Sequence, residues 1–146
     1  MKLPGIYALY AAFIGVGGHS AASVHAGLLV ANALSTLLCF WIGRRLFGAL
    51  AGAVASVAYA ALSLSPAMLG LAAHAESFSV AFALGGLWVL LPAIDRRRAG
   101  ACFASGLLVG TALVIKQNGA AFAAFSIAWV AGATLRVAAK ERARML

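Results

Sequence analysis

Long apolar runs separated by short polar junctions dominate the pattern of this chain. A membrane-spanning helix needs about 20 apolar residues, with a range of about 17–25. Five runs reach or nearly reach that length, and they cover residues 23–42, 49–67, 76–94, 100–116 and 119–136. The pattern therefore predicts an all-α fold, a polytopic transmembrane helical bundle that makes residues 1–146 a single transmembrane region.

The first stretch, MKLPGIYALYAAFIGVGG, is also apolar, but it is short and contains Pro4 and four glycines. It could form a sixth span, or a signal peptide, since a lone lysine precedes the apolar run and SVHA offers small residues for cleavage. Tyr7 and Tyr10 lie one helical turn apart, and tyrosines favour the level of the lipid headgroups. We therefore predict an interfacial helix within residues 1–20 that does not cross the membrane.

The junctions between the runs alternate in charge. Nine of the eleven Lys and Arg residues occur in GRRLFG, in DRRRAG and in the tail that begins at Arg136, and these alternate junctions share one side. Cytoplasmic loops of membrane proteins carry the excess of Lys and Arg. The sequence therefore predicts five spans over residues 23–136 and a cytoplasmic tail over 137–146, with Glu76, Lys2 and Lys116 on the outer side.

Composition supports the membrane assignment. Hydrophobic residues make up 64% of the chain and charged residues 10%, with a mean hydropathy of +1.02. A soluble domain has about 45–50% apolar and about 25% charged residues. The net charge of +8 would indicate nucleic acid in a soluble chain, but here the cations fall in short clusters between apolar runs. We expect the lipid bilayer, and no nucleic acid, to be the partner of these cations.

Cysteine and histidine indicate no metal centre and no cofactor. Cys39 and Cys102 fit neither a disulfide framework nor a zinc spacing, and we interpret both as packing residues. His19, His25 and His74 are scattered along the chain, with no repeated ligand spacing between them.

Small residues recur at four-residue spacing in two of the runs. Gly48, Gly52 and Ser56 form one such series, and Gly106 and Gly110 form another. Small residues at this spacing let helix backbones approach closely inside a membrane. We therefore expect both series to lie at helix–helix contacts.

Four stretches follow one another in an order that resembles a known family. They are KLPGIYALYAAFIGVGGHS, WIGRRLFG, HAESF and GLLVGTALVIKQNG. The chain resembles the N-terminal part of the GT-C membrane glycosyltransferases, in the glycosyltransferase family 39-like group of protein O-mannosyltransferases and aminoarabinose transferases. The resemblance implies transfer of a sugar from a polyprenyl-phosphate donor to an acceptor at the outer face of a bacterial inner or plasma membrane.

The resemblance also implies roles for three charged residues. Glu76 matches the family's second acidic position and would be catalytic, and Lys2 and Lys116 would bind the donor phosphate. Each has a plainer interpretation: a carboxylate in a first helical turn interacts favourably with the helix dipole, and lysines at helix ends extend to water. Gln117, Asn118 and His74 are possible polar support for the site, although Gln117 and Asn118 also fit a simple polar turn.

The chain departs from the family pattern in two respects. The family's Lys-Pro-Pro stretch reads Lys2-Leu3-Pro4 here, and the first span and the acidic loop that would precede it are not in the sequence. We therefore expect further N- and C-terminal segments of a longer polypeptide as partners. The alternatives are a half-size membrane transporter and a non-catalytic assembly subunit. The transporter interpretation predicts charges near span centres, whereas the charges here lie at span ends.

Overall fold

A computed structural model describes residues 3–65 and 74–145, with the side chains of the last helix described as far as Arg136. The described residues form helices and their connections, and no strand occurs among them, which confirms the all-α prediction. The helices are α1 Pro4–Gly17, α2 Ala21–Phe47, α3 Ala49–Leu64, α4 Ala75–Asp95, α5 Ala99–Ile115 and α6 Gly119–Met145.

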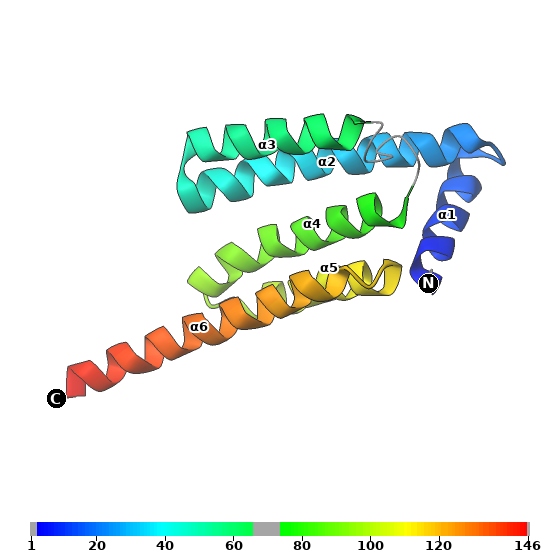
Figure 1. Ribbon diagram of the computed structural model, residues 1–146. Helices are drawn as coiled ribbons and strands as arrows, with labels where there is room; N and C mark the ends of the chain where they lie inside the picture. The colour runs from blue at the N-terminus through cyan, green and yellow to red at the C-terminus, as the bar shows by residue number, and fades with distance from the viewer. Residues whose placement is uncertain (1–2, 66–73, 146) are drawn as a thin grey trace.

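The helices form two layers with one helix across an end (Figure 1). Helices α2 and α3 make an antiparallel hairpin, and α4, α5 and α6 lie together beside it. Helix α2 joins the layers because it contacts both α3 and α4. Helix α1 runs transverse to the others and contacts α2 and α5. We call the end with the α2–α3 and α4–α5 turns the arginine end, and the opposite one, where α4 begins and α5 ends, the Glu76 end.

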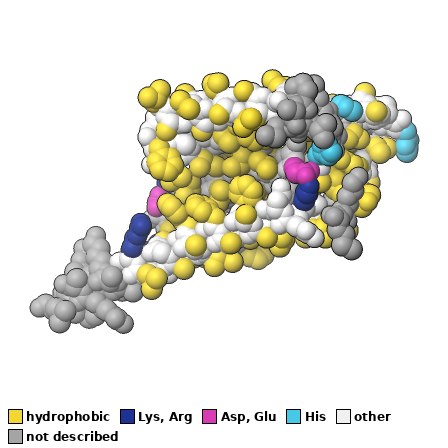
Figure 2. Space-filling view, viewed as in Figure 1, with side chains coloured by type: hydrophobic (Ala, Val, Ile, Leu, Met, Phe, Trp, Pro, Cys, Tyr) yellow, Lys and Arg dark blue, Asp and Glu magenta, His cyan; other side chains and the backbone are white. Residues whose placement is uncertain are grey.

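The face of the bundle that Figure 2 shows is apolar between its ends, and the described charges on it lie at the two ends. Large side chains such as Val57 on α3 and Ile127 on α6 are exposed. Three segments are long and apolar enough to cross a membrane: α2, α4 and residues 119–136 of α6. Helices α3 and α5 are apolar but shorter, with 16 and 17 residues. A 17-residue helix is about 25 Å long, against a hydrocarbon core of about 30 Å.

Each of the five predicted ranges contains a helix, and two of the helices extend beyond the predicted spans. Helix α2 continues five residues past residue 42 and is capped by Gly48, whose φ of 97° only glycine adopts readily. Helix α6 continues past Arg136 to Met145. That all five helices cross the membrane stays a prediction, as does the interfacial location of α1.

The main core cluster lies close to the Glu76 end, where four helices meet. Ile6 of α1, Leu28 of α2, Phe78 of α4 and Ile115 of α5 are all buried there. The aromatic ring of Phe13 packs on Phe78 with the ring centroids 5.6 Å apart. This core holds the transverse α1 against the ends of the other helices.

One predicted small-residue contact is confirmed in the α2–α3 hairpin. Gly52 is buried, and a Cβ atom placed on it would lie 2.5 Å from the carbonyl oxygen of Phe40. A Cβ atom on Gly43 would likewise lie 2.8 Å from the Cα atom of Gly52. The two backbones therefore approach as closely as small-residue packing in membranes allows.

The second predicted contact, through Gly106 and Gly110, was wrong for the described part of the chain. A Cβ atom on either residue would meet nothing within 4 Å, because both glycines face open grooves beside α5. The close contact of α5 with α4 instead uses Gly86, where a Cβ atom would lie 2.6 Å from a methyl carbon of Val109. Four-residue spacing shows that a helix has a surface of small residues, but it does not show which helix, if any, packs against that surface.

This difference predicts opposite effects for two identical substitutions. Gly52→Ala should lower the thermal stability of the detergent-solubilised protein, because overpacking costs about 1–3 kcal/mol. Gly106→Ala should leave stability unchanged or raise it, because alanine is favoured over glycine in a helix by about 1 kcal/mol. Melting temperatures followed by size-exclusion chromatography after heating measure both. Equal effects of the two substitutions would contradict the α2–α3 contact described here.

Candidate functional site

Glu76 and Lys116 form an ion pair between Oε1 and Nζ at the Glu76 end of the bundle (Figure 2). The two residues are forty positions apart in the sequence, and the antiparallel packing of α4 and α5 brings them together. The Glu76 side chain is 46% exposed and that of Lys116 34% exposed, so the pair is reachable from outside the bundle. This convergence is the feature that sequence spacing alone could not establish.

The helix ends favour the charges that they carry. Glu76 lies in the first turn of α4, and Lys116 is the C-cap of α5, with its N–H bonded to the carbonyl of Ala112. A negative charge near a helix N-terminus and a positive charge near a C-terminus are each stabilised by about 0.3–1 kcal/mol. The helix dipoles therefore stabilise both charges where they lie. Both side chains are also partly exposed, so a ligand can reach them.

Two serines hold α4 and α5 in the register that pairs these charges. The Ser79 hydroxyl donates to the carbonyl oxygen of Ala112 at 2.9 Å, one turn below the ion pair. The Ser105 hydroxyl donates to the carbonyl oxygen of Gly86 at 2.8 Å, two turns further along the helices. Both serines are buried. Sequence reasoning missed them; the available signal was a serine three residues after Glu76, on the same side of the helix.

Aromatic side chains pack in the core cluster close to the start of α4. Phe78, two residues after Glu76, is buried and contacts the ring of Tyr10 edge-on at 6.1 Å between centroids. Partial burial raises the pKa of the Tyr10 hydroxyl above its usual value, so the phenol stays neutral at physiological pH. Tyr7 points outward and is 59% exposed. The two tyrosines therefore differ in environment although they are one turn apart.

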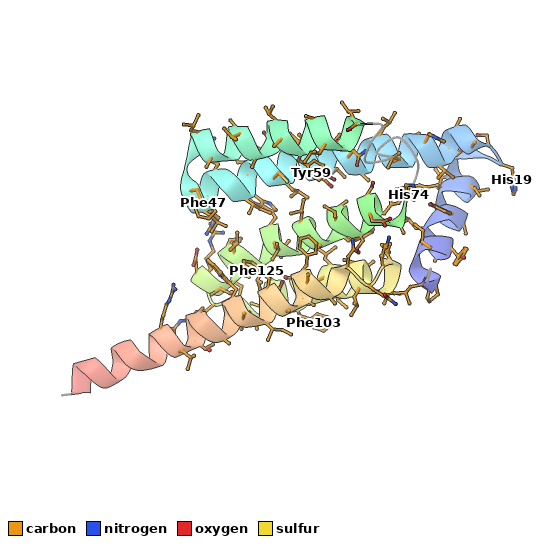
Figure 3. All side chains as sticks on the ribbon, in the orientation of Figure 1. His19, Phe47, Tyr59, His74, Phe103 and Phe125 are labelled. Carbon is orange, nitrogen blue, oxygen red and sulfur yellow. The ribbon has the colours of Figure 1, made fainter. Side chains whose placement is uncertain are left out.

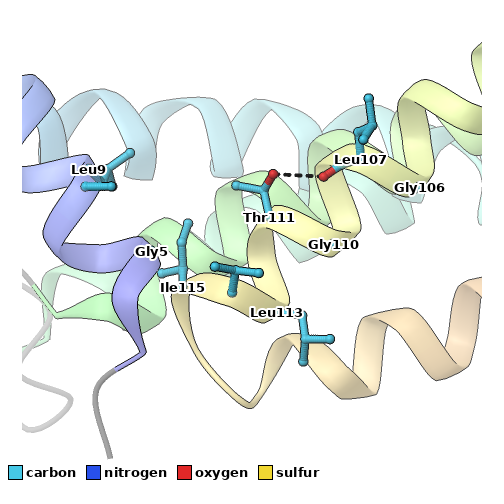
Figure 4. Close-up of a pocket in the computed structure, with 10 residues that line it drawn as sticks. Gly5, Leu9, Gly106, Leu107, Gly110, Thr111, Leu113 and Ile115 are labelled. Atoms are coloured by element: carbon cyan, nitrogen blue, oxygen red, sulfur yellow. Dashed lines mark hydrogen bonds between the residues drawn. The ribbon is translucent and has the colours of Figure 1, made fainter.

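An apolar groove of about 720 Å³ has Ile115, the residue before Lys116, in its lining (Figure 4). It lies between α1 and α5. These helices approach closely at Gly5, where a Cβ atom would lie 2.7 Å from the carbonyl oxygen of Val114. The Thr111 hydroxyl donates to the carbonyl of Leu107 within α5, which leaves little free polarity in the groove. The lining residues are Gly5, Ala8, Leu9, Gly106, Leu107, Gly110, Thr111, Leu113, Val114 and Ile115.

The other residues predicted for the site have simpler surroundings. Gln117 and Asn118 are exposed and form the α5–α6 turn, closed by the N–H of Gly119 on the carbonyl of Lys116 at 3.0 Å. His74 is exposed at the N-cap position of α4 and makes no side-chain capping bond (Figure 3). Lys2 lies outside the described residues. The structure thus joins Glu76 to Lys116. Gln117, Asn118 and His74 are close to this pair in the sequence, but no side-chain contact with it is described.

The arginine end has a different chemistry. Asp95 accepts from Arg45 at 2.5 Å, so it is the exposed partner of an arginine of α2 and not of the RRR stretch that follows it. The Arg44 guanidinium lies 5.4 Å from the centre of the Trp41 ring. Among the described residues, no group of three or more His, Cys, Asp or Glu side chains is placed to hold a metal ion.

Comparison with known proteins gives one match. The model of a family described as dolichyl-phosphate-mannose-protein mannosyltransferase matches residues 2–145, which is nearly the whole chain. Neither the curated proteins nor the solved structures contain a match.

The Ser79 hydrogen bond can be tested against a serine that bonds only within its own helix. Ser79→Ala should lower the melting temperature, since interhelical hydrogen bonds in membrane bundles contribute about 0.6 kcal/mol on average and up to about 1.7. Ser126→Ala is the matched control, because its hydroxyl donates to the carbonyl of Phe122 in α6. A loss of stability no greater for Ser79→Ala than for Ser126→Ala would remove Ser79 from the role of fixing the register.

Proposed function

This chain belongs to the dolichyl-phosphate-mannose-protein mannosyltransferase family, and on that premise we propose that it acts in sugar transfer from a polyprenyl-phosphate donor to an acceptor at the outer face of the membrane. The family is one of membrane glycosyltransferases, and the apolar helices agree with a membrane location. The proposal adds three points to the family assignment: the polyprenyl-phosphate donor, the outer face of the membrane, and the roles of Glu76 and Lys116.

The Glu76–Lys116 ion pair is the observation that carries the proposal. It joins one carboxylate and one ammonium group at a bundle end, both partly exposed. A lipid phosphodiester is an anion that competes with Glu76 for Lys116. Donor binding would therefore exchange the Lys116–carboxylate contact for a Lys116–phosphate contact and release the carboxylate beside the reacting sugar. The resting pair keeps the two side chains near their positions until the donor arrives.

The chemistry assigned to the pair follows from this exchange. The acceptor hydroxyl oxygen forms a bond to the anomeric carbon while the bond from that carbon to the phosphate oxygen breaks, and the phosphate leaves with the electron pair. Glu76 takes the hydroxyl proton as general base, a role that contributes typically 10²–10⁴-fold. Lys116 offsets the negative charge that grows on the departing phosphate. No further reactant is needed for the atoms and charges to balance.

The apolar groove beside α5 supports a lipid-borne donor. It starts at Ile115, immediately before Lys116, and continues along α5 to Gly106, more than two turns away from the ion pair. A phosphate on Lys116 would therefore have an apolar path for its prenyl chain directly next to it. Burying that chain between α1 and α5 provides binding energy proportional to the apolar area removed from water.

The outer-face assignment rests on the distribution of cations. Arg44, Arg45 and the RRR stretch lie in the turns of one end, and Lys116 lies at the other. The positive-inside rule then makes the arginine end cytoplasmic and the Glu76 end external. Interfacial α1 would lie on the external surface, where it covers the core next to the site.

The catalytic assignment predicts that Glu76→Gln lowers sugar transfer about 10²–10⁴-fold, because the amide cannot accept the proton. The fold should remain intact, since glutamine is tolerated in a first helical turn. Transfer from a polyprenyl-phosphate sugar is measured in membranes with the protein level controlled. Asp95→Asn makes the same chemical change at the arginine end and should leave transfer near normal.

A second variant in the same assay separates donor binding from catalysis. Lys116→Ala should raise the KM for the lipid donor more than Glu76→Gln does. Unchanged turnover in Glu76→Gln would reduce Glu76 to a helix-start residue with no part in transfer.

The topology predicts that a single cysteine at position 76, in a chain whose Cys39 and Cys102 are replaced by serine, reacts with a membrane-impermeant maleimide from outside intact cells. A cysteine at position 97, in the α4–α5 turn, is the control and should react only after the membrane is made permeable. The opposite labelling pattern would place the Glu76 end in the cytoplasm and exclude transfer at the outer face.

A further inference from the structure

Arg97 has a backbone conformation that glycine normally provides. It follows the C-cap of α4 with a φ of 51°, and it is the one described residue other than glycine with a positive φ. The N–H of Arg97 bonds to the carbonyl of Ile94 at 3.1 Å, and the N–H of Arg98 bonds to that of Ala93 at 2.9 Å. These two bonds make a Schellman motif, in which this position usually holds glycine because a Cβ atom is strained there.

The side chain of Arg97 lines a cavity of about 370 Å³ between the α4–α5 turn and α6. It is the one charged residue of that lining, and the Thr134 hydroxyl already donates to the carbonyl of Ala131 at 2.8 Å. No hydrogen bond or ion pair joins the Arg97 guanidinium to the described part of the chain. The lining residues are Ala93, Ile94, Arg97, Ala99, Cys102, Val130, Ala133 and Thr134.

A second cavity lies next to the first, between α5 and α6. It has a volume of about 380 Å³, shares Cys102 and Val130 with the first and extends to Gly106 and Ile127. Only Ser105 and Ser126 contribute hydroxyls to it, and both donate to backbone carbonyls. We call the two adjacent cavities the α5–α6 passage; Arg97 lines the part that lies at the α4–α5 turn.

Two tryptophans lie near the arginine end of the bundle. The rings of Trp41 and Trp88 are 6.1 Å apart, and tryptophans concentrate at membrane interfaces. The described carboxylate at this end, Asp95, is bonded to Arg45. The other two arginines of the RRR stretch, Arg96 and Arg98, line a different cavity with Trp88. Within the part of the chain whose side chains are described, Arg97 therefore lines its cavity without a paired carboxylate.

We infer that this site binds an anionic phospholipid of the leaflet at the arginine end, with its phosphate on the Arg97 guanidinium and one acyl chain in the passage between α5 and α6. A planar guanidinium can bind two phosphate oxygens at once. Basic pockets between membrane helices are a known type of site for anionic headgroups. The inference is independent of the Glu76–Lys116 site, which lies at the opposite end of the bundle.

The test compares variants of the purified full chain in detergent by native mass spectrometry, with phosphatidylglycerol or phosphatidylcholine as the added lipid. The protein should bind phosphatidylglycerol more tightly than phosphatidylcholine. Arg97→Gly should weaken phosphatidylglycerol binding about five- to tenfold, the effect of losing one charged contact. It should also keep or raise the melting temperature, since glycine relieves the positive φ. Arg96→Ala, the control for net charge, should weaken binding by less than about twofold, since it lines another cavity.

A second pair of variants tests the acyl-chain part without changing any charge. Val130→Phe should fill the passage and weaken phosphatidylglycerol binding, whereas Leu135→Phe, at a 70% exposed position of α6 that lines neither cavity, should not. Soluble glycerol phosphate should fail to displace the lipid, because it has no chain to bury.

Three outcomes would overturn the inference. Equal losses in Arg96→Ala and Arg97→Gly would show a general positive field and no site at Arg97. Equal binding of the two lipids would exclude recognition of the anionic headgroup. Displacement by glycerol phosphate, or normal binding by Val130→Phe, would exclude the acyl-chain passage.

Discussion

The antiparallel packing of α4 on α5 is the contact on which the other features of this bundle depend. Inside a membrane the hydrophobic effect does not drive helices together, because lipid is as apolar as the helix surface. Close packing and interhelical hydrogen bonds must then select the arrangement. Here the Ser79–Ala112 and Ser105–Gly86 bonds, seven residues apart on each helix, hold α4 and α5 in one register. A different register would separate Glu76 from Lys116.

The same packing gives the two ends of the bundle different electrostatic character. At the Glu76 end a carboxylate and an ammonium group form an ion pair, and α1 lines the adjacent groove. At the arginine end, Asp95 is the carboxylate among the described side chains, and it is paired with Arg45. Between the ends the described side chains are almost all uncharged and apolar. Charge is therefore confined to the levels where water and lipid headgroups can solvate it, since a charge at the bilayer centre costs at least about 2.5–3.5 kcal/mol.

The two proposed binding sites have the same arrangement of charge and apolar surface. Each places a cation at a bundle end and an apolar groove next to it along α5. At Lys116 the cation is paired with a carboxylate, so a ligand phosphate must displace Glu76. At Arg97 the described residues provide no such partner, so binding there requires no exchange with them. This difference is consistent with sugar transfer at the Glu76 end and with binding of a structural lipid at the arginine end.

The sequence predicted well wherever the physics is local to one helix. The positions of the five apolar helices followed from run length, and the alternation of Lys and Arg correctly assigned the arginine turns to one end of the bundle. Glu76 and Lys116 were recognisable as charges at the edges of apolar runs. The ends of the helices were less predictable from run length. Helix α2 ends where Gly48 adopts a positive φ, and α6 continues past the apolar run through basic residues that are good helix formers.

Relations between helices were decided only by the tertiary structure. Gly52 and Gly106 have the same spacing signature, yet one contacts a neighbouring backbone and the other faces an open groove, since spacing defines a surface and not its partner. Likewise, Arg96, Arg97 and Arg98 are alike in sequence, and only the left-handed turn at Arg97 directs them to different cavities. The sequence by itself determined that this is a helical membrane protein with charges at two levels. The pairing of Glu76 with Lys116 depended on register, which arises from contacts between residues far apart in the chain.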